Sequence, residues 1–405
     1  MLALTFTSNT GGFLMVNVVK NVRFDGQLWD LSIKDGVIEK IEHANSDYST
    51  TSTDFDAKGF LYVPALADMH VHLDKHFLGE PWRPLQPFTT LPKQLKFEKE
   101  MLASMQSSLE ERVSLMTELM VKQGTTKIRT HVDVDPGIGI KHLEAVVQLR
   151  EQLRGIMEIE IVAFPQQGLL KSNSLGVMKD ALRNGADLVG GVDPAGLDRK
   201  VESSLEAMFE LSAEFDAGVD LHLHDPGHLG LYTIDLFADY TMQVKKQGRT
   251  AVSHAYCLGM LADDEINQTL SALSEADVSI ISSVPIDRPA PRAKSLVNAG
   301  VKFLIGNDNV RDAWSPFGNG DLLQRGSRLA EKSGWITDEQ LITTYSFITN
   351  RSLTPQLGEK ADFMLVNAEN LQHAIAAYPK REAVFSNGQL ISNRENEKIL
   401  DGTSR

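Results

Sequence analysis

The chain of 405 residues contains one cysteine, Cys257, and this scarcity excludes several classes of protein. A lone cysteine cannot form an intramolecular disulfide, which favours a reducing compartment. It also cannot build a zinc site that needs two or more thiolates, such as the Pro-Cys-x-x-Cys type.

Positive charge and long apolar runs are also scarce. Lys and Arg number 40 against 54 Asp and Glu, which gives a net charge of −14 at pH 7. Because this charge repels phosphates and anionic lipids, we expect neither nucleic acid nor a membrane as partner. No apolar run approaches the ~18 residues of a membrane span, and the first residues lack the basic start of a signal peptide. We expect a cytoplasmic protein whose residues 1–14 form a disordered leader.

Several common catalytic motifs are missing. The sequence has no Gly-x-Ser-x-Gly elbow, no Walker A loop, no His-Glu-x-x-His and no Gly-x-Gly-x-x-Gly. Serine-hydrolase, nucleotide-dependent and dinucleotide-dependent chemistry are therefore disfavoured. With 42% hydrophobic residues, the chain can nevertheless bury a large core.

Both ends of the chain are rich in short strands. Residues 15–65 and 355–400 alternate apolar and polar side chains, and each contains a hairpin dipeptide, Asp35-Gly36 and Asn387-Gly388. The two segments are predicted to pair into one small β-sandwich domain. The long middle segment, residues 66–354, has a different pattern.

The middle segment alternates apolar β-branched runs with helix-period stretches, which is typical of a parallel sheet. Candidate strand-end residues are His72, His131, Gln166, Asp193, His222, His254, Ser282 and Asp308. Most intervals between them are about 30 residues, the length of one βα unit. Eight such units favour an α/β fold of the (β/α)8 TIM barrel type over a doubly wound sheet. The longer first interval is predicted to hold a Pro-rich loop and one long charged helix near residues 93–123.

Polar side chains gather at these strand ends, where barrel enzymes keep their chemistry. His70 and His72 are two residues apart on one strand, so their imidazoles face the same way. Two nitrogen donors on one rigid element form half of a metal site. A pair of packed or solvent-facing histidines is the alternative.

Three further strand ends supply the rest of a site. His222 and His224 share a face, so one can complete the metal shell while the other lines the pocket, and we favour His222 as the ligand. Asp308 can supply the carboxylate ligand and accept a proton from metal-bound water. His254 can polarise a substrate or hold the attacking hydroxide. Asp225 lies where the chain turns before Pro-Gly.

Neutral and orienting groups are also present. The amide of Gln166 both donates and accepts hydrogen bonds, which suits the edge of an amide-like heterocycle, although a loop-fixing role is equally compatible with the pattern. His131, Asp133 and Asp193 are candidates for orienting the ligands.

These motifs resemble those of the amidohydrolase superfamily, in particular its cytosine deaminases and aminotriazine hydrolases. The resemblance extends from near Val16 to the segment KADFMLVNA and rests on the motifs VPALADMHVHLDKHF, RTHVDVD, IVAFPQQG, LVGGVDPA, DLHLHDPG, VSHAYC and GNDNVRDAWSPFGNGD. It implies a metal-bearing (β/α)8 barrel with a β-sandwich built from both chain ends. A homo-oligomer is also expected on this basis.

The resemblance implies roles for individual residues. One divalent ion, Zn²⁺ or Fe²⁺, would be bound by four ligands, His70, His72, His222 and Asp308. His254 resembles the histidine beside the activated water. Gln166 resembles the glutamine that binds a pyrimidine, and Trp314 resembles a pocket tryptophan. His224 and Lys75 complete the predicted substrate-binding set.

Three departures from the cytosine deaminases disfavour cytosine itself as the substrate. Asp225 stands where those enzymes have a proton-transferring glutamate, Asn309 replaces an aspartate, and Lys75 in HLDK resembles the HMDK of a triazine hydrolase. No lysine falls at a strand end that would bridge two metals as a carbamate, so one metal is favoured.

The sequence therefore predicts hydrolytic deamination of a small cyclic amidine, with His254 and Asp308 beside the activated water and Asp225 moving a proton to the ring nitrogen or the leaving amine. The substrate would be a small cytosine-like or aminotriazine-like heterocycle, losing ammonia or an amine. Hydrolysis of a cyclic amide, as in hydantoinase-like relatives, is the alternative reaction. A non-catalytic scaffold is disfavoured because all four ligand positions are filled.

Overall fold

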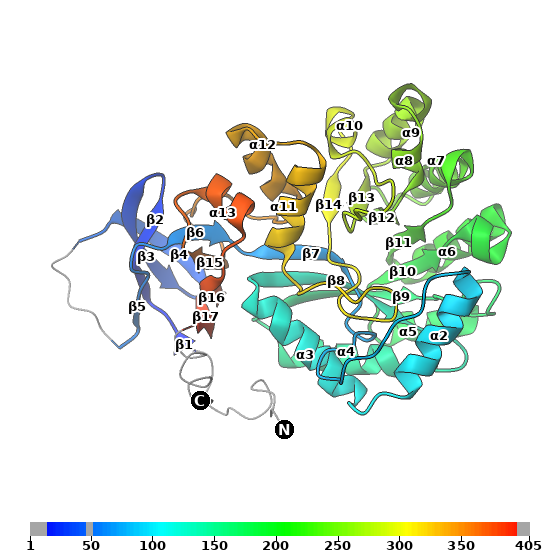
Figure 1. Ribbon diagram of the computed structural model, residues 1–405, viewed down its shortest axis with the longest axis horizontal. Helices are drawn as coiled ribbons and strands as arrows, with labels where there is room; N and C mark the ends of the chain where they lie inside the picture. The colour runs from blue at the N-terminus through cyan, green and yellow to red at the C-terminus, as the bar shows by residue number, and fades with distance from the viewer. Residues whose placement is uncertain (1–13, 46–51, 395–405) are drawn as a thin grey trace.

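The computed structural model describes residues 14–45 and 52–394, which form a helix-covered barrel with a β-sheet packed beside it (Figure 1). The predicted leader, apart from Leu14, lies outside the described residues. So do residues 395–400 of the predicted β-sandwich segment.

The barrel is one sheet of eight parallel strands in the order β14-β13-β12-β11-β10-β9-β8-β7. In chain order the strands are β7 (Leu66–Val71), β8 (Thr125–Asp133), β9 (Glu158–Phe164), β10 (Leu188–Val192), β11 (Gly218–Leu223), β12 (Thr250–His254), β13 (Val278–Ser282) and β14 (Phe303–Ile305). The sheet closes where Asp308 forms a parallel bridge with Val71 and its N–H donates to the His70 carbonyl at 2.7 Å. A Cβ at Gly306 would lie 2.5 Å from the His70 backbone, so only glycine permits this close approach.

The predicted TIM barrel is confirmed, and closure of the sheet excludes the doubly wound alternative. Each predicted strand-end residue lies within three residues of an observed strand end. Apolar β-branched runs such as Val278–Ser282 are buried throughout because barrel strands are covered on both faces.

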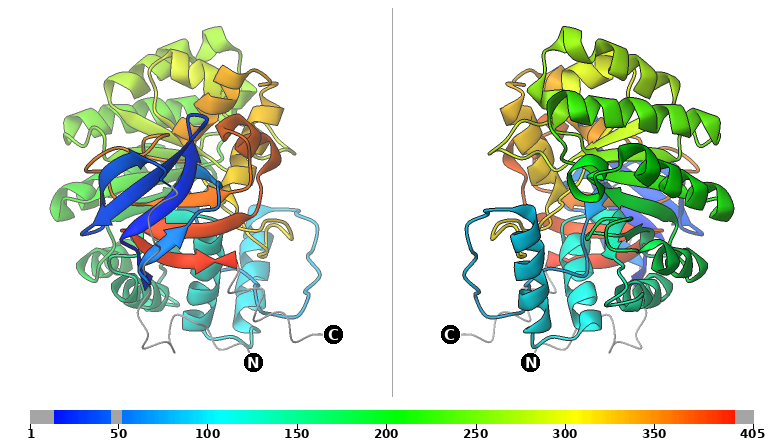
Figure 2. Two further views of the ribbon diagram at one scale, coloured as in Figure 1. Left: turned by 90° about the vertical axis from the view of Figure 1, so that its left-hand side faces the viewer. Right: turned by 90° about the vertical axis from the view of Figure 1, so that its right-hand side faces the viewer.

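Helices and short helical turns surround the barrel (Figure 2). They are α2 (Leu91–Ala103), α3 (Leu109–Lys122), α4 (Lys141–Gln152), α5 (Leu175–Arg183), η1 (Pro194–Asp198), α6 (Val201–Phe215), α7 (Gly227–Gln243), α8 (Cys257–Met260), α9 (Asp263–Glu275), α10 (Ala293–Asn298), α11 (Leu322–Lys332), α12 (Asp338–Thr343), η2 (Thr344–Phe347) and α13 (Leu371–Ala377). The single long helix predicted near residues 93–123 is wrong. Ser108 and Glu111 form a capping box that starts a second helix, so α2 and α3 are separate.

The second sheet joins both ends of the chain, with blue and red strands side by side in Figure 1. Its nine strands are β1 (Leu14–Met15), β2 (Val18–Phe24), β3 (Gln27–Lys34), β4 (Val37–His43), β5 (Asp54–Asp56), β6 (Leu61–Pro64), β15 (Phe363–Val366), β16 (Arg381–Ser386) and β17 (Gln389–Asn393). Both predicted hairpin turns are present, and their central residues have positive φ, for example 51° at Asp35 and 78° at Gly36. The sheet is β-sandwich-like, as predicted.

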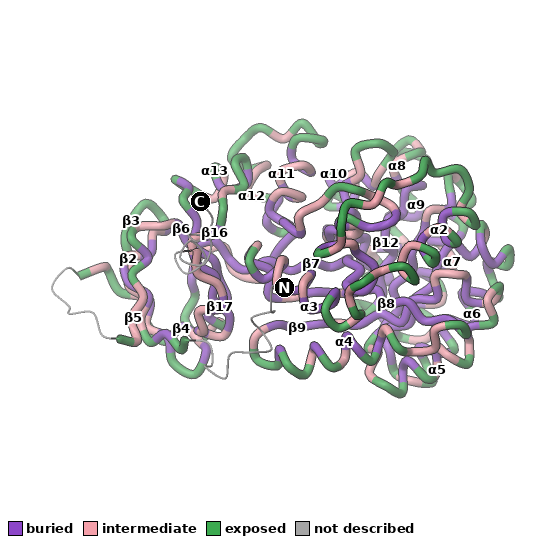
Figure 3. The backbone as a smooth tube through the Cα atoms, turned by 60° about the horizontal axis from the view of Figure 1, so that its bottom comes forward, coloured by how far each residue is buried: buried purple, intermediate pink, exposed green. Residues whose placement is uncertain are grey.

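Two main apolar cores stabilise the two parts. The larger lies between the barrel strands and their helices, and the smaller lies within the β-sandwich-like sheet around Leu31, Phe363 and Phe385. Figure 3 shows the barrel strands buried and the outer turns of the helices exposed. Among the described residues, every helix is too short or too polar to cross a bilayer.

Candidate active site

A cavity of about 330 Å³ opens where the barrel strands end. All the predicted site residues line it except His70 and Asp225, which are both buried. Eight strands that end on one face therefore bring together side chains that are more than 200 residues apart in sequence, such as His72 and Asp308.

The hydrogen bonds of His70 and His72 fix which ring nitrogen carries the proton. Ser253 Oγ donates to Asp220 Oδ1 at 2.7 Å, so this hydroxyl must accept at 2.9 Å from Nδ1 of His70. His72 Nδ1 lies 3.0 Å from the carbonyl oxygen of His131, which can only accept. Both rings therefore carry the proton on Nδ1 and leave the lone pair of Nε2 available to a metal.

Asp308 faces both of these free nitrogens. Its Oδ1 is 3.6 Å from His70 Nε2 and 3.5 Å from His72 Nε2. Asp308 has a φ of 56°, in the left-handed region, which turns the chain at the closure of the barrel.

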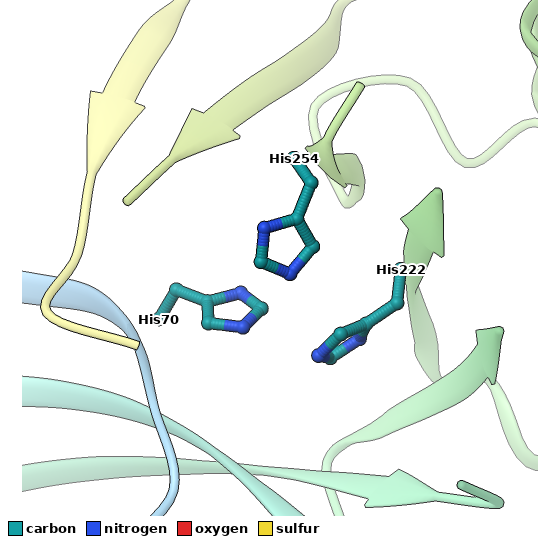
Figure 4. A group of neighbouring side chains, drawn as sticks. All are labelled: His70, His222 and His254. Carbon is teal, nitrogen blue, oxygen red and sulfur yellow. The ribbon is translucent and has the colours of Figure 1, made fainter. Parts of the chain in front are cut away.

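The geometry favours His222 over His224 as the third imidazole ligand. His222 is buried on β11, and neither ring nitrogen has a hydrogen-bond partner among the described residues. Its ring centroid lies 4.5 Å from that of His70, and Figure 4 shows the two rings turned toward one another. Burial and the nearby His131 lower the pKa of His222 well below its ordinary value, which keeps the ring in the neutral, ligating form.

His254 ends β12 and points toward the same centre (Figure 4). Its φ of 70° and that of Ala255, 44°, are both left-handed, a local strain that aims the ring into the cavity. The ring stacks on His224 with centroids 4.5 Å apart. Burial and His224 lower the pKa of His254 well below its ordinary value, so the ring is neutral at pH 7.

The donor set suits a divalent metal ion. The ligand atoms of His70, His72 and Asp308 lie within 4.8 Å of one another, and so do those of His70, His222 and His254. Buried ring nitrogens without a hydrogen-bond partner in the described chain include His70 Nε2, which lies 3.6 Å from Asp308 Oδ1, and both nitrogens of His222. Such atoms are costly unless a ligand occupies the centre.

A third acid and histidine group lies deeper in the barrel and does not suit a second ion. It comprises His70, His131 and Asp220. Arg129 already donates to Asp220 at 2.9 Å, so the negative charge that a metal ion would need is already paired with a guanidinium.

Three of the predicted ring-binding residues, Lys75, Gln166 and Trp314, line the cavity and contact Glu98. Lys75 Nζ lies 2.9 Å from Asp133 Oδ1, and Gln166 Nε2 donates to Glu98 Oε2 at 3.0 Å. The indole N–H of Trp314 donates to the same oxygen of Glu98. Burial by itself would lower the pKa of Lys75. The nearby carboxylates of Asp133 and Glu98 raise that pKa by more than burial lowers it, so the side chain keeps its ammonium form.

His224 and Asp225 have different surroundings although they are neighbours. Nδ1 of His224 is 3.0 Å from Asp193 Oδ2, and the ring lines the cavity. Burial lowers the pKa of His224, but Asp193 outweighs burial and raises it overall. Asp225 instead accepts backbone N–H groups of Ala195 and Gly196 at 3.1 and 3.0 Å. Burial and Asp193 raise the pKa of Asp225 to about 6.

The orienting residues expected from the sequence have specific partners. His131 accepts from His72 through its carbonyl, Asp193 holds His224, and Asp133 holds Lys75. Two residues of the site, Glu98 and Phe164, were not predicted from the sequence. Phe164 stacks on His222 with centroids 4.0 Å apart, and no sequence signal distinguishes it from an ordinary core residue.

Comparison with known proteins identifies the family. The sequence profile of the amidohydrolase family matches residues 96–389. The chain belongs to the amidohydrolase family. This family assignment confirms the resemblance predicted from the motifs.

Individual amidohydrolases match over nearly the whole chain. N-isopropylammelide isopropyl amidohydrolase of Pseudomonas sp. (strain ADP) is 32% identical over 91% of this chain and 94% of its own. The crystal structure of N-isopropylammelide isopropylaminohydrolase from Burkholderia multivorans has 32% identity and a TM-score of 0.86, covering 93% of this chain and 98% of that one. The 5-methylcytosine deaminase of Klebsiella pneumoniae, at 22% identity and a TM-score of 0.80 over 93% and 97%, shares the fold.

Proposed function

We propose that this amidohydrolase hydrolyses the bond between a ring carbon and an exocyclic amino or alkylamino nitrogen of a small cyclic amidine, an aminotriazine-like or cytosine-like ring. The observation that carries the proposal is the cavity that joins a histidine and aspartate centre to a ring-binding end containing Lys75, Gln166 and Trp314. The name of the Pseudomonas relative supports an alkylamino-substituted triazine as a first candidate.

One divalent ion, zinc or iron, would be held by His70, His72, His222 and Asp308, whose nitrogen and oxygen donors suit either metal. When bound, it would supply a Lewis acid and lower the pKa of water toward neutrality. The chain's own residues then bind the ring and move protons.

His254 and Asp308 line the cavity beside the place where water would attack. We assign His254 to hold the attacking water and Asp308 to accept a proton from it. The water oxygen bonds to the amino-bearing carbon, and the carbon–nitrogen bond breaks as the nitrogen gains a proton. His224 lines the cavity with Nδ1 fixed by Asp193, so Nε2 is placed to deliver that proton. The predicted transfer by Asp225 stays a prediction that requires its carboxylate to leave Ala195 and Gly196.

The proposal is tested by product analysis on metal-loaded protein. Cytosine, ammelide and N-isopropylammelide are supplied in turn, and ammonia or isopropylamine is measured. The Asp308→Ala protein serves as the blank, because loss of the carboxylate that faces His70 and His72 should abolish turnover. We expect amine release from at least one ring by the wild type and none by the variant.

Two results would contradict the proposal. A new carboxylate without free amine would indicate ring opening, the cyclic amide hydrolase reaction. Full activity of Asp308→Ala would remove Asp308 from the chemistry.

A further inference from the structure

Glu98, a buried acid on α2, contacts the ring-binding end of the cavity. Its carboxylate accepts from Gln166 and Trp314 through Oε2, and Oε1 lies 3.5 Å from Lys75 Nζ. We infer that Glu98 is a positioning residue that orients the Gln166 amide so that the cavity selects rings with an N–H beside a carbonyl. This inference rests on the proposed function and names the substrate class for the same site.

The orientation follows from which atoms can donate. Trp314 has one donor, its indole N–H, and Glu98 Oε2 receives it. The same oxygen is 3.0 Å from Gln166, so it must face the amide NH₂ and not the amide carbonyl. Gln166 lines the cavity and keeps two groups for a substrate, its carbonyl oxygen and its second N–H. Those groups complement a ring N–H and the adjacent ring carbonyl, which together form a lactam edge.

Trp314 contributes no hydrogen bond to a ring, because its donor is already used by Glu98. It packs instead with Leu91, Leu95 and Leu197 as an apolar wall. Selection by hydrogen bonding at this end of the cavity thus depends on Gln166 and on Lys75, and Glu98 touches both.

The need to anchor α2 to the barrel does not explain why a glutamate is buried at position 98. The helix is already attached to the barrel by Gln94, which donates to the Ala313 carbonyl at 2.7 Å, and by Lys99, 2.8 Å from Asp135. The side chain of Glu98 is only 2% exposed, and burial of a carboxylate is unfavourable unless its partners repay the lost hydration. The partners that do so among the described residues are side chains of the cavity.

The test measures binding, so it does not depend on turnover. Uracil offers lactam edges, whereas dimethyluracil, methylated on both ring nitrogens, keeps the carbonyls and loses every ring N–H. The dissociation constants of both are measured by calorimetry on zinc-loaded wild type, Glu98→Ala, Glu98→Gln and Glu100→Gln. Glu100 lies on the same helix, is exposed and pairs with Lys96, so its variant is the matched control.

We expect the wild type and Glu100→Gln to bind uracil about tenfold or more tightly than dimethyluracil, because an unpaired buried acceptor penalises the methylated ring. Glu98→Ala should reduce this ratio below about threefold by releasing the amide of Gln166. Glu98→Gln keeps an acceptor oxygen for Gln166 and Trp314 and should restore most of the preference. Zinc content and melting temperature of each variant check that the fold is intact.

Three results would overturn the inference: an unchanged ratio in Glu98→Ala, an equal loss in Glu98→Gln, or no measurable uracil binding by the wild type. A steric cause of the preference would survive in Glu98→Ala, and a purely structural role would lower stability without changing the ratio. Failure of the proposed function would appear separately, as absence of amine release from every ring tested.

Discussion

At the scale of the residue, the candidate metal centre depends on hydrogen bonds that select one form of each histidine. The clearest case is His70, whose Nδ1 is held by Ser253, which in turn donates to Asp220. Asp220 is paired with Arg129 at 2.9 Å, so the chain of contacts continues from His70 to a guanidinium. Because the direction of every hydrogen bond in it is fixed, the lone pair of His70 can only be on Nε2.

Replacement of Ser253 by alanine tests this arrangement. His70 would lose the acceptor for its Nδ1 proton, so its ring would be free to rotate or change tautomer. We expect zinc affinity to fall roughly 10–100-fold while the fold is retained. Chelator competition measures the affinity, and Ser271→Ala, on the exposed face of α9, is the control. Equal zinc affinity in the two variants would contradict this account.

At the scale of the element, α2 and α3 show how local signals divide the chain. Ser108 accepts from the Glu111 N–H at 3.1 Å, and the Glu111 carboxylate accepts from the Ser108 N–H at 2.8 Å. This reciprocal pair starts α3 and separates it from α2. The separation leaves α2 free to lie beside the cavity, where Leu95 and Glu98 are buried.

The capping box makes a quantitative prediction. Ser108→Ala removes the acceptor for the Glu111 N–H and should lower the free energy of unfolding by about 1 kcal/mol. Urea unfolding of the metal-loaded protein measures the change. Ser203→Ala, at an exposed position of α6, is the control and should not change the free energy of unfolding. If both variants unfold alike, Ser108 is not a stabilising cap.

At the scale of the whole molecule, one buried ion pair joins the β-sandwich-like sheet to the barrel. Arg381 on β16 donates to Asp321, which also caps α11 by accepting from Leu323 and Gln324. The guanidinium additionally donates to the Gln123 carbonyl at the end of α3 at 2.9 Å. Three elements of the barrel and sheet are therefore held through one side chain.

Removal of the Arg381 side chain should lower the stability of the folded protein. Arg381→Met leaves the buried Asp321 carboxylate without its cation, so we expect the free energy of unfolding to fall by about 3–5 kcal/mol. Arg154→Met breaks an exposed pair with Glu151 and should have no measurable effect. Denaturant unfolding compares the two variants with the wild type. A loss for Arg381→Met no larger than that for Arg154→Met would show that the pair does not stabilise the junction.

Much of the candidate site was readable from local pattern because strand ends repeat at regular intervals. His70, His72, His254 and Asp308 were located by their positions at the ends of apolar runs, and the structure brings them together. Glu98 was not found, although a signal exists. It follows Leu91 and Leu95 at the helical spacing that places all three on one face, and a charged residue on an apolar face indicates a buried partner.

The choice between His222 and His224 could not be made from spacing. Both side chains lie on the same face of the chain near the end of β11, and the motif is symmetrical about them. Their neighbours favour His222, since Asp193, which follows the adjacent strand β10, binds His224 and leaves His222 facing His70. Asp225 is similar, because its contacts with Ala195 and Gly196 come from a turn that sequence pattern did not reveal.

The sequence by itself determined the barrel, the pairing of both chain ends and the strand-end histidines and aspartate that are candidate metal ligands, because hydrophobic period, hairpin dipeptides and strand-end residues are local properties. Only the tertiary structure decided which histidine nitrogens are free, which way Asp225 turns and what Glu98 touches. Those outcomes depend on hydrogen bonds between residues more than 25 positions apart, and such bonds are fixed when the strands close into a barrel.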